Sequence, residues 1–372
     1  MKKVHLPEGD SVTLTPTFKK AIKEVHAMKY IGIDYHKQYF VATIMNEQGE
    51  IIRRDKASTD RSSIRHYFKH ADLSGGVKAV MEACYGWEYF YDEASELVDE
   101  LIMAHPLKTR LIAEARIKTD TIDSETLAHL LRADLIPRAY APDLETRGQK
   151  NLLRYRSSLV AMKVRIKNII HSVLTRNHIE DQPFTSLSDK FGKRGLSYLR
   201  AVSLKGNDTV ILNEYLDLLE ETDKKIKEAE KRIRTLCRED KICTLLRSIP
   251  GIGPILAVTI RYEIDNIERF MSAGKLCSYA GLVPSTYSSG NRTYQGKITK
   301  QGNKWLRWAM IEAAQKAPAK DLWLQGFYQR ISRNGKKIAR VAVARKLLEI
   351  IYRMWKEEKP YYKKGTVALP VV

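Results

Sequence analysis

The chain has 372 residues, enough for two or three domains, and its 44% of hydrophobic residues is ordinary for a protein with a buried core. Its formal net charge is +20 and its sequence pI is about 9.6. This excess of positive charge excludes the acidic surface of a typical metabolic enzyme. It favours a nucleic-acid partner over an anionic membrane, because no cluster of basic residues adjoins an apolar anchor.

No apolar run approaches the roughly 18 residues needed to cross a bilayer, so we expect no membrane association. Residues 1–27 are polar and charged, and they lack the apolar segment of a signal peptide. The cysteines have neither metal-ligand nor disulfide-framework spacing, which predicts a protein of the reducing cytoplasm. They are Cys84, Cys237, Cys243 and Cys277.

Residues 1–28 are predicted to be an N-terminal extension, and residues 29–142 a first domain of mixed α/β type. Runs of β-favouring residues and one amphipathic segment predict its first elements. The predicted strands are 29–34, 39–44, 51–53, 77–82 and 101–104, and a helix is predicted at 61–70. Three strands joined by hairpin turns and followed by alternating strands and helices are the order of an RNase H-like domain.

Residues 143–243 are predicted to be a helical coiled-coil region, because apolar residues recur at alternate steps of three and four, as in a heptad seam. The first seam comprises Leu152, Tyr155, Leu159, Met162, Ile166, Ile169 and Val173, and the second comprises Leu212, Tyr215, Leu219, Thr222, Ile226, Ala229, Ile233 and Leu236. The seams pair with each other as an antiparallel hairpin or with a second chain. Ordinary core packing in a helical bundle explains the pattern equally well.

Residues 244–372 are predicted to form a mainly α-helical C-terminal domain. Near its start, the segment IPGIG (249–253) lies between two helical patterns and resembles the turn of a helix-hairpin-helix motif. Glycines in such a turn let backbone N–H groups approach a phosphate at the start of the second helix. A plain tight turn between two helices is the alternative.

Four carboxylates are candidates for a metal site. Asp34 and Glu82 each end a predicted strand, so both can project from one edge of a sheet. Asp120 and Asp123 are three residues apart, which places both on one face of a helix. Taken singly, each is better explained as a turn former or a helix cap. Together and in this order they predict the D-E-D-D site of an RNase H-like nuclease, in which converging carboxylates hold Mg²⁺.

These segments resemble a known family, the DEDD insertion-sequence transposases. The resemblance to the family's RuvC-like domain lies in IGID (31–34), MEA (81–83) and KTDTID (118–123). The resemblance to its second domain lies in IPGIG (249–253), YAGLVP (279–284), SG (289–290) and GKITKQGNKWLR (296–307). The match runs from Lys29 to about Pro318. One departure is Ser124, at a position where the family usually has alanine.

The resemblance implies a recombinase that is guided by a structured non-coding RNA, the bridge RNA, which pairs with donor and target DNA. It also implies Mg²⁺ held by the D-E-D-D carboxylates and a nucleophilic serine in the second domain. We assign this role to Ser289, which directly precedes Gly290 in a loop rich in Ser and Gly and flanked by basic residues. Ser288 is the alternative. We expect a homo-oligomer, a dimer or a tetramer.

The sequence therefore predicts an insertion-sequence transposase that cleaves and rejoins DNA strands by Mg²⁺-assisted transesterification through a serine. One alternative is a hydrolytic nuclease of the same fold that resembles a Holliday-junction resolvase and uses the carboxylates with water as nucleophile. The other is a non-catalytic nucleic-acid-binding scaffold whose carboxylates are structural.

Overall fold

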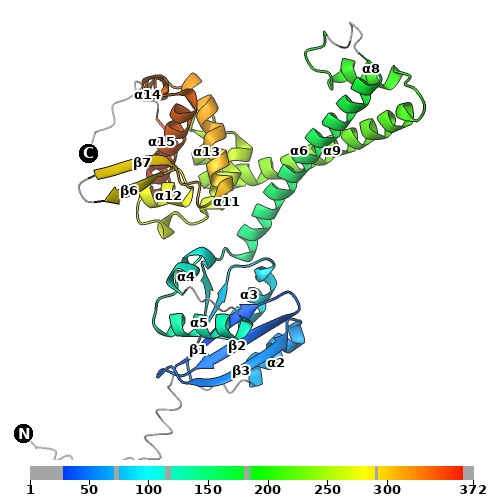
Figure 1. The fold of residues 1–372 in the computed structure, drawn as a ribbon. Helices are drawn as coiled ribbons and strands as arrows, with labels where there is room; N and C mark the ends of the chain where they lie inside the picture. Colours follow the sequence, from blue (N-terminus) through cyan, green and yellow to red (C-terminus); the bar gives the residue numbers. More distant parts are fainter. Residues whose placement is uncertain are drawn as a thin grey trace, which may run out of the picture. The chain divides into compact units, whose positions relative to one another are not determined.

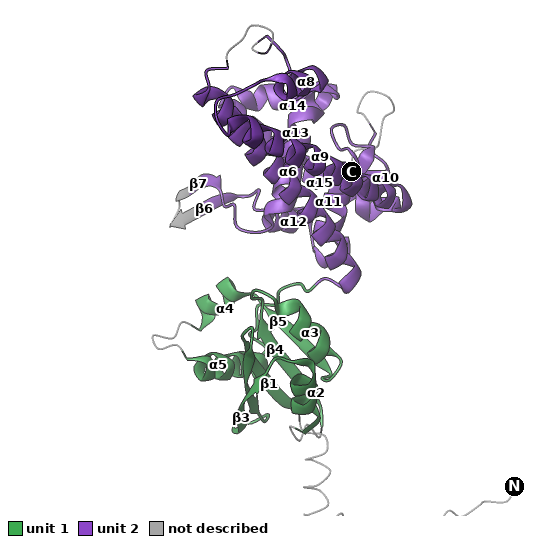
Figure 2. Ribbon diagram, turned by 90° about the vertical axis from the view of Figure 1, so that its right-hand side faces the viewer, with its two compact units in different colours: residues 1–141 green, residues 142–372 purple. Residues whose placement is uncertain are grey.

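The computed structural model describes residues 28–70, 75–113, 119–179, 184, 186–289 and 292–362. The chain divides into two compact units, residues 1–141 and 142–372, which Figure 2 shows in different colours. Within the described residues, no helix is both long and apolar enough to cross a bilayer. Except for Met28, the predicted extension falls outside the described residues, as does Lys118 of the KTDTID segment.

The first unit is a five-stranded sheet with helices on both faces (Figure 1). The strand order is β3-β2-β1-β4-β5, in which the first three strands are antiparallel and β4 and β5 run parallel to β1. The mixed α/β domain expected from the sequence is therefore confirmed. Its elements are β1 (Lys29–Tyr35), β2 (Tyr39–Met45), β3 (Ile51–Ser58), α2 (Arg61–His70), β4 (Val77–Glu82), α3 (Trp87–Ser95), β5 (Glu100–Ala104), α4 (Pro106–Ile112) and α5 (Asp120–Arg132).

Alternate residues of the central strands face opposite layers of helices. Ile31 and Ile33 of β1 are fully buried in a core that includes Phe90 of α3 and residues of α2. Gly32, between them, faces α5 on the other side of the sheet. A second, smaller core with residues of α5 covers that side. The sheet is thus closed by α2 and α3 on one face and by α5 on the other.

Gly32 permits an unusually close contact between β1 and α5. A Cβ atom at this position would lie 1.9 Å from the carbonyl oxygen of Ser124, so only glycine lets the helix pack directly on the strand. Beside this contact the buried hydroxyls of Thr43 and Ser124 are 2.8 Å apart, and Ser124 donates to the carbonyl of Thr121 at 3.0 Å. Thr43 therefore donates to Ser124. The pair explains how serine is accommodated where the resembling family usually has alanine.

The second unit is almost entirely helical (Figure 1). Its two longest helices, α6 and α9, pack against each other in antiparallel orientation, and both contact α11 of the C-terminal helices. The elements are α6 (Leu144–Arg176), α8 (Lys193–Ala201), α9 (Asp208–Glu239), α10 (Lys241–Arg247), α11 (Pro254–Ile264), η1 (Ile267–Arg269), α12 (Ala273–Tyr279), β6 (Pro284–Ser289), β7 (Arg292–Ile298), α13 (Lys304–Lys316), η2 (Ala317–Ala319), α14 (Leu322–Ser332) and α15 (Lys336–Glu357).

The two predicted seams are only partly correct. The α9 seam is buried at six of its eight predicted positions, but Leu216 and Cys237 are buried in place of the adjacent Tyr215 and Leu236. In α6 the prediction is wrong for Tyr155 and Met162, which are 48% and 46% exposed, and Leu153 is buried instead. A straight α-helix has 3.6 residues per turn, so its buried stripe drifts by about 20° per heptad from a strict seven-residue repeat. The seams meet within one chain.

The C-terminal helices enclose a single large core, and the predicted turn at 249–253 lies between α10 and α11. The strands β6 and β7 form a β-hairpin at the position where the sequence predicts a loop. Its strands flank Gly290 and Asn291, which are outside the described residues. Gly-Asn between two runs rich in Thr and Tyr is a hairpin signal, and the high content of Ser and Gly concealed it.

The close contact at Gly32 makes a direct prediction. Gly32→Ala places a methyl group inside the van der Waals radius of the α5 backbone, so α5 must move away from the sheet. We expect the free energy of unfolding of the first unit to fall by about 3 kcal/mol, the cost of a severe overpacking. Gly148→Ala is the control, because nothing lies within 4 Å of its added Cβ and it lies in α6. Chemical denaturation of both variants measures the difference, and equal unfolding midpoints would contradict it.

Candidate active site

Strand alternation places two candidate carboxylates on the face of the sheet that α5 covers. Asp34 and Glu82 each follow by two residues a position that faces α5, namely Gly32 on β1 and Val80 on β4. These strands are parallel and adjacent, and their pairing register brings the two carboxylates to the same edge of the sheet. The ends of these two strands therefore place Asp34 and Glu82 next to each other on one face of the sheet.

The third candidate, Asp120, opens α5. The hydroxyl of Thr119 caps this helix by accepting a hydrogen bond of 3.2 Å from the backbone N–H of Ile122. Asp120 and Asp123 both lie in the first turn, where the positive end of the helix dipole stabilises negative charge. Because Gly32 brings the start of α5 close to β1, Asp120 reaches the end of the strand that carries Asp34.

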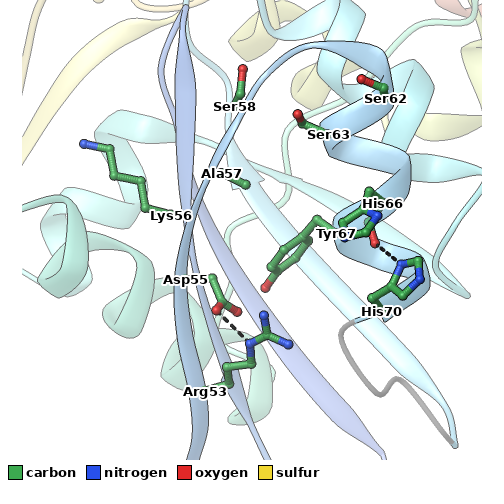
Figure 3. A pocket seen from close by; sticks show the side chains of 10 residues that line it. All are labelled: Arg53, Asp55, Lys56, Ala57, Ser58, Ser62, Ser63, His66, Tyr67 and His70. Atoms are coloured by element: carbon green, nitrogen blue, oxygen red, sulfur yellow. Dashed lines mark hydrogen bonds and ion pairs between the residues drawn. The ribbon is translucent and has the colours of Figure 1, made fainter.

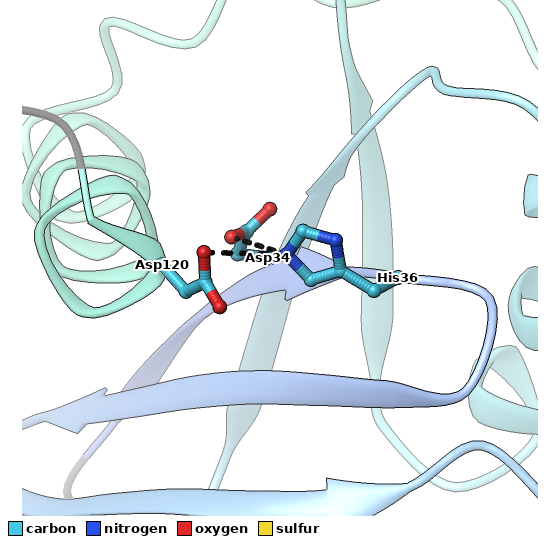
Figure 4. Close-up of side chains that lie close together, drawn as sticks. All are labelled: Asp34, His36 and Asp120. Carbon is cyan, nitrogen blue, oxygen red and sulfur yellow. Dashed lines mark hydrogen bonds and ion pairs between the residues drawn. The ribbon is translucent and has the colours of Figure 1, made fainter.

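The functional atoms of Asp34, Asp120 and His36 form a tight group (Figure 4). One nitrogen of His36, Nε2, is 3.1 Å from Oδ2 of Asp34 and 3.5 Å from Oδ1 of Asp120. One ligand atom from each residue lies within 4.8 Å of the others. All three side chains are partly exposed, so a small ligand can reach them from solvent. Glu82 and Asp123 lie outside this group.

Tyr39 holds Asp120 in place, and Lys56 packs on the ring of Tyr39. The hydroxyl of Tyr39 on β2 donates a hydrogen bond of 2.9 Å to Oδ2 of Asp120. The ammonium of Lys56 on β3 lies 3.6 Å from the centre of the Tyr39 ring, a cation–π contact. The carboxylate of Asp120 therefore has one oxygen fixed by Tyr39, and its other oxygen faces His36.

Burial and the neighbouring charges together set the pKa of the Asp34 carboxyl group. Partial burial raises the pKa of its carboxyl group, the adjacent His36 lowers it, and the negative charges of Asp120 and Asp123 raise it further. The balance is a raised pKa, which means that the ionised form of Asp34 is short of stabilising partners. A cation placed among these carboxylates would offset both the burial and the mutual repulsion.

This donor set fits a divalent metal ion. Carboxylate oxygens are the ligands that hard divalent cations prefer, and an imidazole nitrogen is an additional ligand for transition metals. Asp34, His36 and Asp120 are the residues whose atoms could hold such an ion. Glu82 at the end of β4 and Asp123 in the first turn of α5 lie at the positions from which further carboxylates can contribute.

A hollow of about 570 Å³ adjoins the carboxylates, and it is lined by residues of β2 and β3 and by the start of α5. Asp120 forms part of its wall, and the cations Arg54 and Lys56 line it from β3. Arg54 is paired with Glu125, whereas Lys56 faces the ring of Tyr39. Positive charge next to acidic metal ligands suits a phosphate-bearing substrate, because the cations neutralise the phosphate.

A second hollow, of about 550 Å³, lies between β3 and α2 (Figure 3). His66 and His70 stack there with ring centres 4.1 Å apart, but Nδ1 of His70 donates to the carbonyl of His66 at 2.9 Å. Asp55 is neutralised by Arg53 at 2.7 Å. Asp55 is the one carboxylate among the residues that line this hollow, and it is already paired with Arg53, so we do not consider the hollow a metal-dependent catalytic site.

The candidate nucleophile belongs to the other unit. Ser289 is the last residue of β6 and pairs with Arg292 of β7, and Ser288 pairs with Thr293. The side chains of Ser288 and Ser289 are outside the described part of the chain. The structure therefore positions the backbone that carries both serines at the tip of a β-hairpin.

The base of this β-hairpin is held by buried polar contacts. Asn303 accepts hydrogen bonds from the first N–H groups of α13, and its amide donates to Glu263 at 2.8 Å and to the hydroxyl of Tyr279 at 3.0 Å. Glu263 is only 2% exposed, and it is also paired with Arg154 of α6. A Cβ at Gly302 would lie 2.2 Å from the carbonyl oxygen of Tyr279, so only glycine fits where the backbone passes this close to Tyr279. Polar contacts thus join α6, α11, α12 and α13 beneath the β-hairpin.

A mixed sheet of this strand order, with carboxylates clustered beneath one helix and a basic helical unit after it, is consistent with an RNase H-like enzyme that acts on nucleic acid. Two family profiles match consecutive parts of the chain. A DEDD transposase profile of the IS110 type matches residues 31–179, and the profile of the IS116/IS110/IS902 transposase family matches residues 243–329. The chain is an insertion-sequence transposase of the IS110/IS116 family, a class of enzyme that cleaves DNA.

Similar proteins extend over most of the chain. The transposase for insertion sequence element IS1111A of Coxiella burnetii is 26% identical over 92% of this chain and 94% of its own length. A probable family 20 transposase of Pseudomonas aeruginosa is 24% identical over 89% of this chain and 98% of its own length. A shorter match, 35% identical, is to the pilin gene-inverting protein of Moraxella bovis, over 32% of this chain and 39% of that protein.

Sequence reasoning missed two residues of the candidate site, His36 and Tyr39. His36 follows Asp34 by two residues, and the ring of Tyr39 lies 4.7 Å from its own ring. A signal was present, because polar residues directly after a strand-end aspartate lie at the same edge of the sheet. The pattern of carboxylates alone assigns no role to the turn between β1 and β2.

The polar network at the β-hairpin base predicts that Asn303→Ala is strongly destabilising. The variant removes a helix cap and leaves an oxygen of buried Glu263 without its donor, which together cost about 2–4 kcal/mol. Asn207→Ala is the matched control, because Asn207 occupies the N-cap of α9 without a side-chain cap hydrogen bond. Thermal or chemical unfolding of both variants measures the effect. A loss as small as that of the control would show that the network contributes little.

Proposed function

We propose that this chain cleaves DNA strands and rejoins them by transesterification through Ser289, with Mg²⁺ held by Asp34, Glu82, Asp120 and Asp123. The observation that carries the proposal is the convergence of Asp34 and Asp120 at one edge of the sheet. The matches to transposase families in both halves of the chain support it. The two parts of the proposal are separate, since the carboxylates and the serine belong to different units.

In the proposed reaction, the Ser289 hydroxyl attacks the phosphorus of a DNA phosphodiester. A new serine–phosphate ester forms, the bond to one DNA oxygen breaks, and the serine proton leaves so that the departing oxygen can be protonated. A hydroxyl of another DNA end then attacks the phosphorus of this ester. The bond to the serine oxygen breaks, and that oxygen takes up the proton that the attacking hydroxyl loses. The number of phosphate ester bonds stays the same, so the energy of the phosphodiester is conserved. A bound Mg²⁺ would supply positive charge to the phosphate oxygens. Asp34 and Asp120 would hold that charge in place, and Lys56 would contact the adjacent backbone.

The remaining part of the proposal concerns partners. The net charge of +20 supports contact with phosphate backbones of both DNA and RNA. Guidance by a structured bridge RNA follows from the family resemblance. A dimer or tetramer is proposed on the same basis, and it would allow the serine of one subunit to serve the carboxylates of another. Tyr155 and Met162, exposed on α6, are available to a partner subunit.

A hydrolytic nuclease is the principal alternative. It would use the same carboxylates but would have no need for a serine at the tip of a β-hairpin. A relative whose name describes inversion of a pilin gene favours rejoining, because inversion requires cut ends to be joined again. A non-catalytic scaffold would have no need for a partly buried carboxyl group, Asp34, whose pKa is raised by its burial and by the neighbouring carboxylates.

Asp34→Asn tests the metal-dependent part. Loss of a central ligand should reduce strand cleavage roughly thousandfold, equivalent to several kcal/mol of transition-state stabilisation. DNA binding should remain, since it depends on the lysine and arginine side chains. Cleavage of a labelled element end is measured beside binding to the same DNA. Asp217→Asn is the control, because Asp217 is 70% exposed and makes only a surface ion pair with Arg200. Full cleavage by Asp34→Asn would exclude the site.

Ser289→Ala tests the serine. The wild type should form a covalent protein–DNA adduct that survives denaturing electrophoresis, and the variant should bind DNA without forming it. Ser288→Ala is the matched control and should form the adduct normally. A normal adduct from Ser289→Ala together with none from Ser288→Ala would transfer the role to Ser288. Cleavage by the wild type without any adduct would favour the hydrolytic alternative.

A further inference from the structure

We propose that His36 is a ligand of the divalent cation, so that the site binds Mn²⁺ more tightly than Mg²⁺. The inference rests on the proposed function only for the presence of a cation between Asp34 and Asp120. It adds a nitrogen ligand to a set that was expected to consist of carboxylates alone.

The atoms of His36, Asp34 and Asp120 have the spacing of ligands on one metal ion. In an octahedral site with metal–ligand bonds of about 2.1 Å, neighbouring ligand atoms lie about 3 Å apart. Nε2 of His36 is 3.1 Å from Oδ2 of Asp34 and 3.5 Å from Oδ1 of Asp120. The second distance is long for a hydrogen bond but close to the spacing of two ligands on one metal ion. One nitrogen directed at two carboxylates is the arrangement that a shared cation requires (Figure 4).

The ring of His36 is already held in position. The backbone N–H of His36 donates to the carbonyl of Tyr39 at 2.9 Å, which fixes the turn between β1 and β2. Its ring also packs on the ring of Tyr39, with centres 4.7 Å apart and planes inclined by 30°. Because Tyr39 also donates to Asp120, one residue orients both ligands. Metal binding therefore needs no large rearrangement of the imidazole.

A histidine ligand changes which divalent metal the site prefers. Mg²⁺ is a hard cation that takes oxygen ligands and retains several waters. Imidazole nitrogen suits transition metals, so a histidine in the ligand set shifts affinity toward Mn²⁺. The simplest alternative is that His36 only forms a hydrogen bond to Asp34 and moves aside when a cation arrives. In that case the nitrogen would not be bonded to the metal, and its removal would not change the metal preference.

Pulsed electron paramagnetic resonance of the full-length protein loaded with Mn²⁺ separates these possibilities. A directly bound histidine gives a characteristic coupling from its ¹⁴N nucleus to the Mn²⁺ electrons, and we expect this signal from the wild type. The signal does not depend on activity or on any variant. A Mn²⁺ complex without nitrogen coupling would overturn the proposal.

Calorimetric titration with Mn²⁺ and Mg²⁺ provides the quantitative test. His36→Gln should raise the dissociation constant for Mn²⁺ roughly tenfold or more, with a smaller rise for Mg²⁺. His129→Gln is the matched control, because His129 is a partly exposed histidine of the same unit on α5. Equal changes for the two metals would overturn the proposal that His36 makes the site prefer Mn²⁺. The nitrogen signal is measured on the wild type, so it decides the ligation even if His36→Gln fails to fold.

Asp34→Asn distinguishes failure of this inference from failure of the proposed function. If Asp34→Asn abolishes Mn²⁺ binding but the wild-type spectrum lacks nitrogen coupling, the carboxylate site stands and His36 is not a ligand. If Asp34→Asn binds Mn²⁺ as tightly as the wild type, the cation lies elsewhere, and both the inference and the proposed site are wrong.

Discussion

The close packing of α5 on β1 at Gly32 is the constraint on which the first unit depends. Without a side chain at this position, the backbone of the helix at Ser124 can approach the strand directly. Asp34 lies two residues further along the same face, and Asp120 lies one turn before Ser124. The separation of helix and strand therefore sets the separation of the two carboxylates. The absence of a Cβ atom at Gly32 therefore lets α5 pack on β1 and also brings Asp120 close to Asp34.

Crowding of like charges is the cost of this arrangement. Asp34 is partly buried beside Asp120 and near Asp123, and its raised pKa reflects that environment. His36 and Tyr39 offset part of the repulsion through direct contacts with the carboxylates. Such a site is stable enough to fold and still favours a cation, which is the condition that metal-dependent phosphodiester chemistry requires.

The second unit solves a different problem, that of supporting an exposed β-hairpin. Glu263 lies almost fully buried between Arg154 of α6 and Asn303 at the start of α13. Arg154 also lies 4.1 Å from the ring of Trp305, measured to its centre. Because removal of one member would leave a buried partner unsatisfied, the network links the long helix to the base of the β-hairpin that carries Ser289.

The sequence by itself determined the α/β character of the first unit and the helical character of the second, because periodicity of apolar residues is a local property. It also predicted Asp34 and Asp120 as members of one site, since strand ends and a helix start can be recognised locally. Tertiary structure alone decided which face of α6 is buried, because the packing of α6 on its partner decides whether the helix supercoils to keep a seven-residue seam or stays straight and lets the seam drift. It also decided that His36 lies next to Asp120 as well as Asp34, because the distance to Asp120 depends on how far α5 approaches β1, and no local pattern contains that distance.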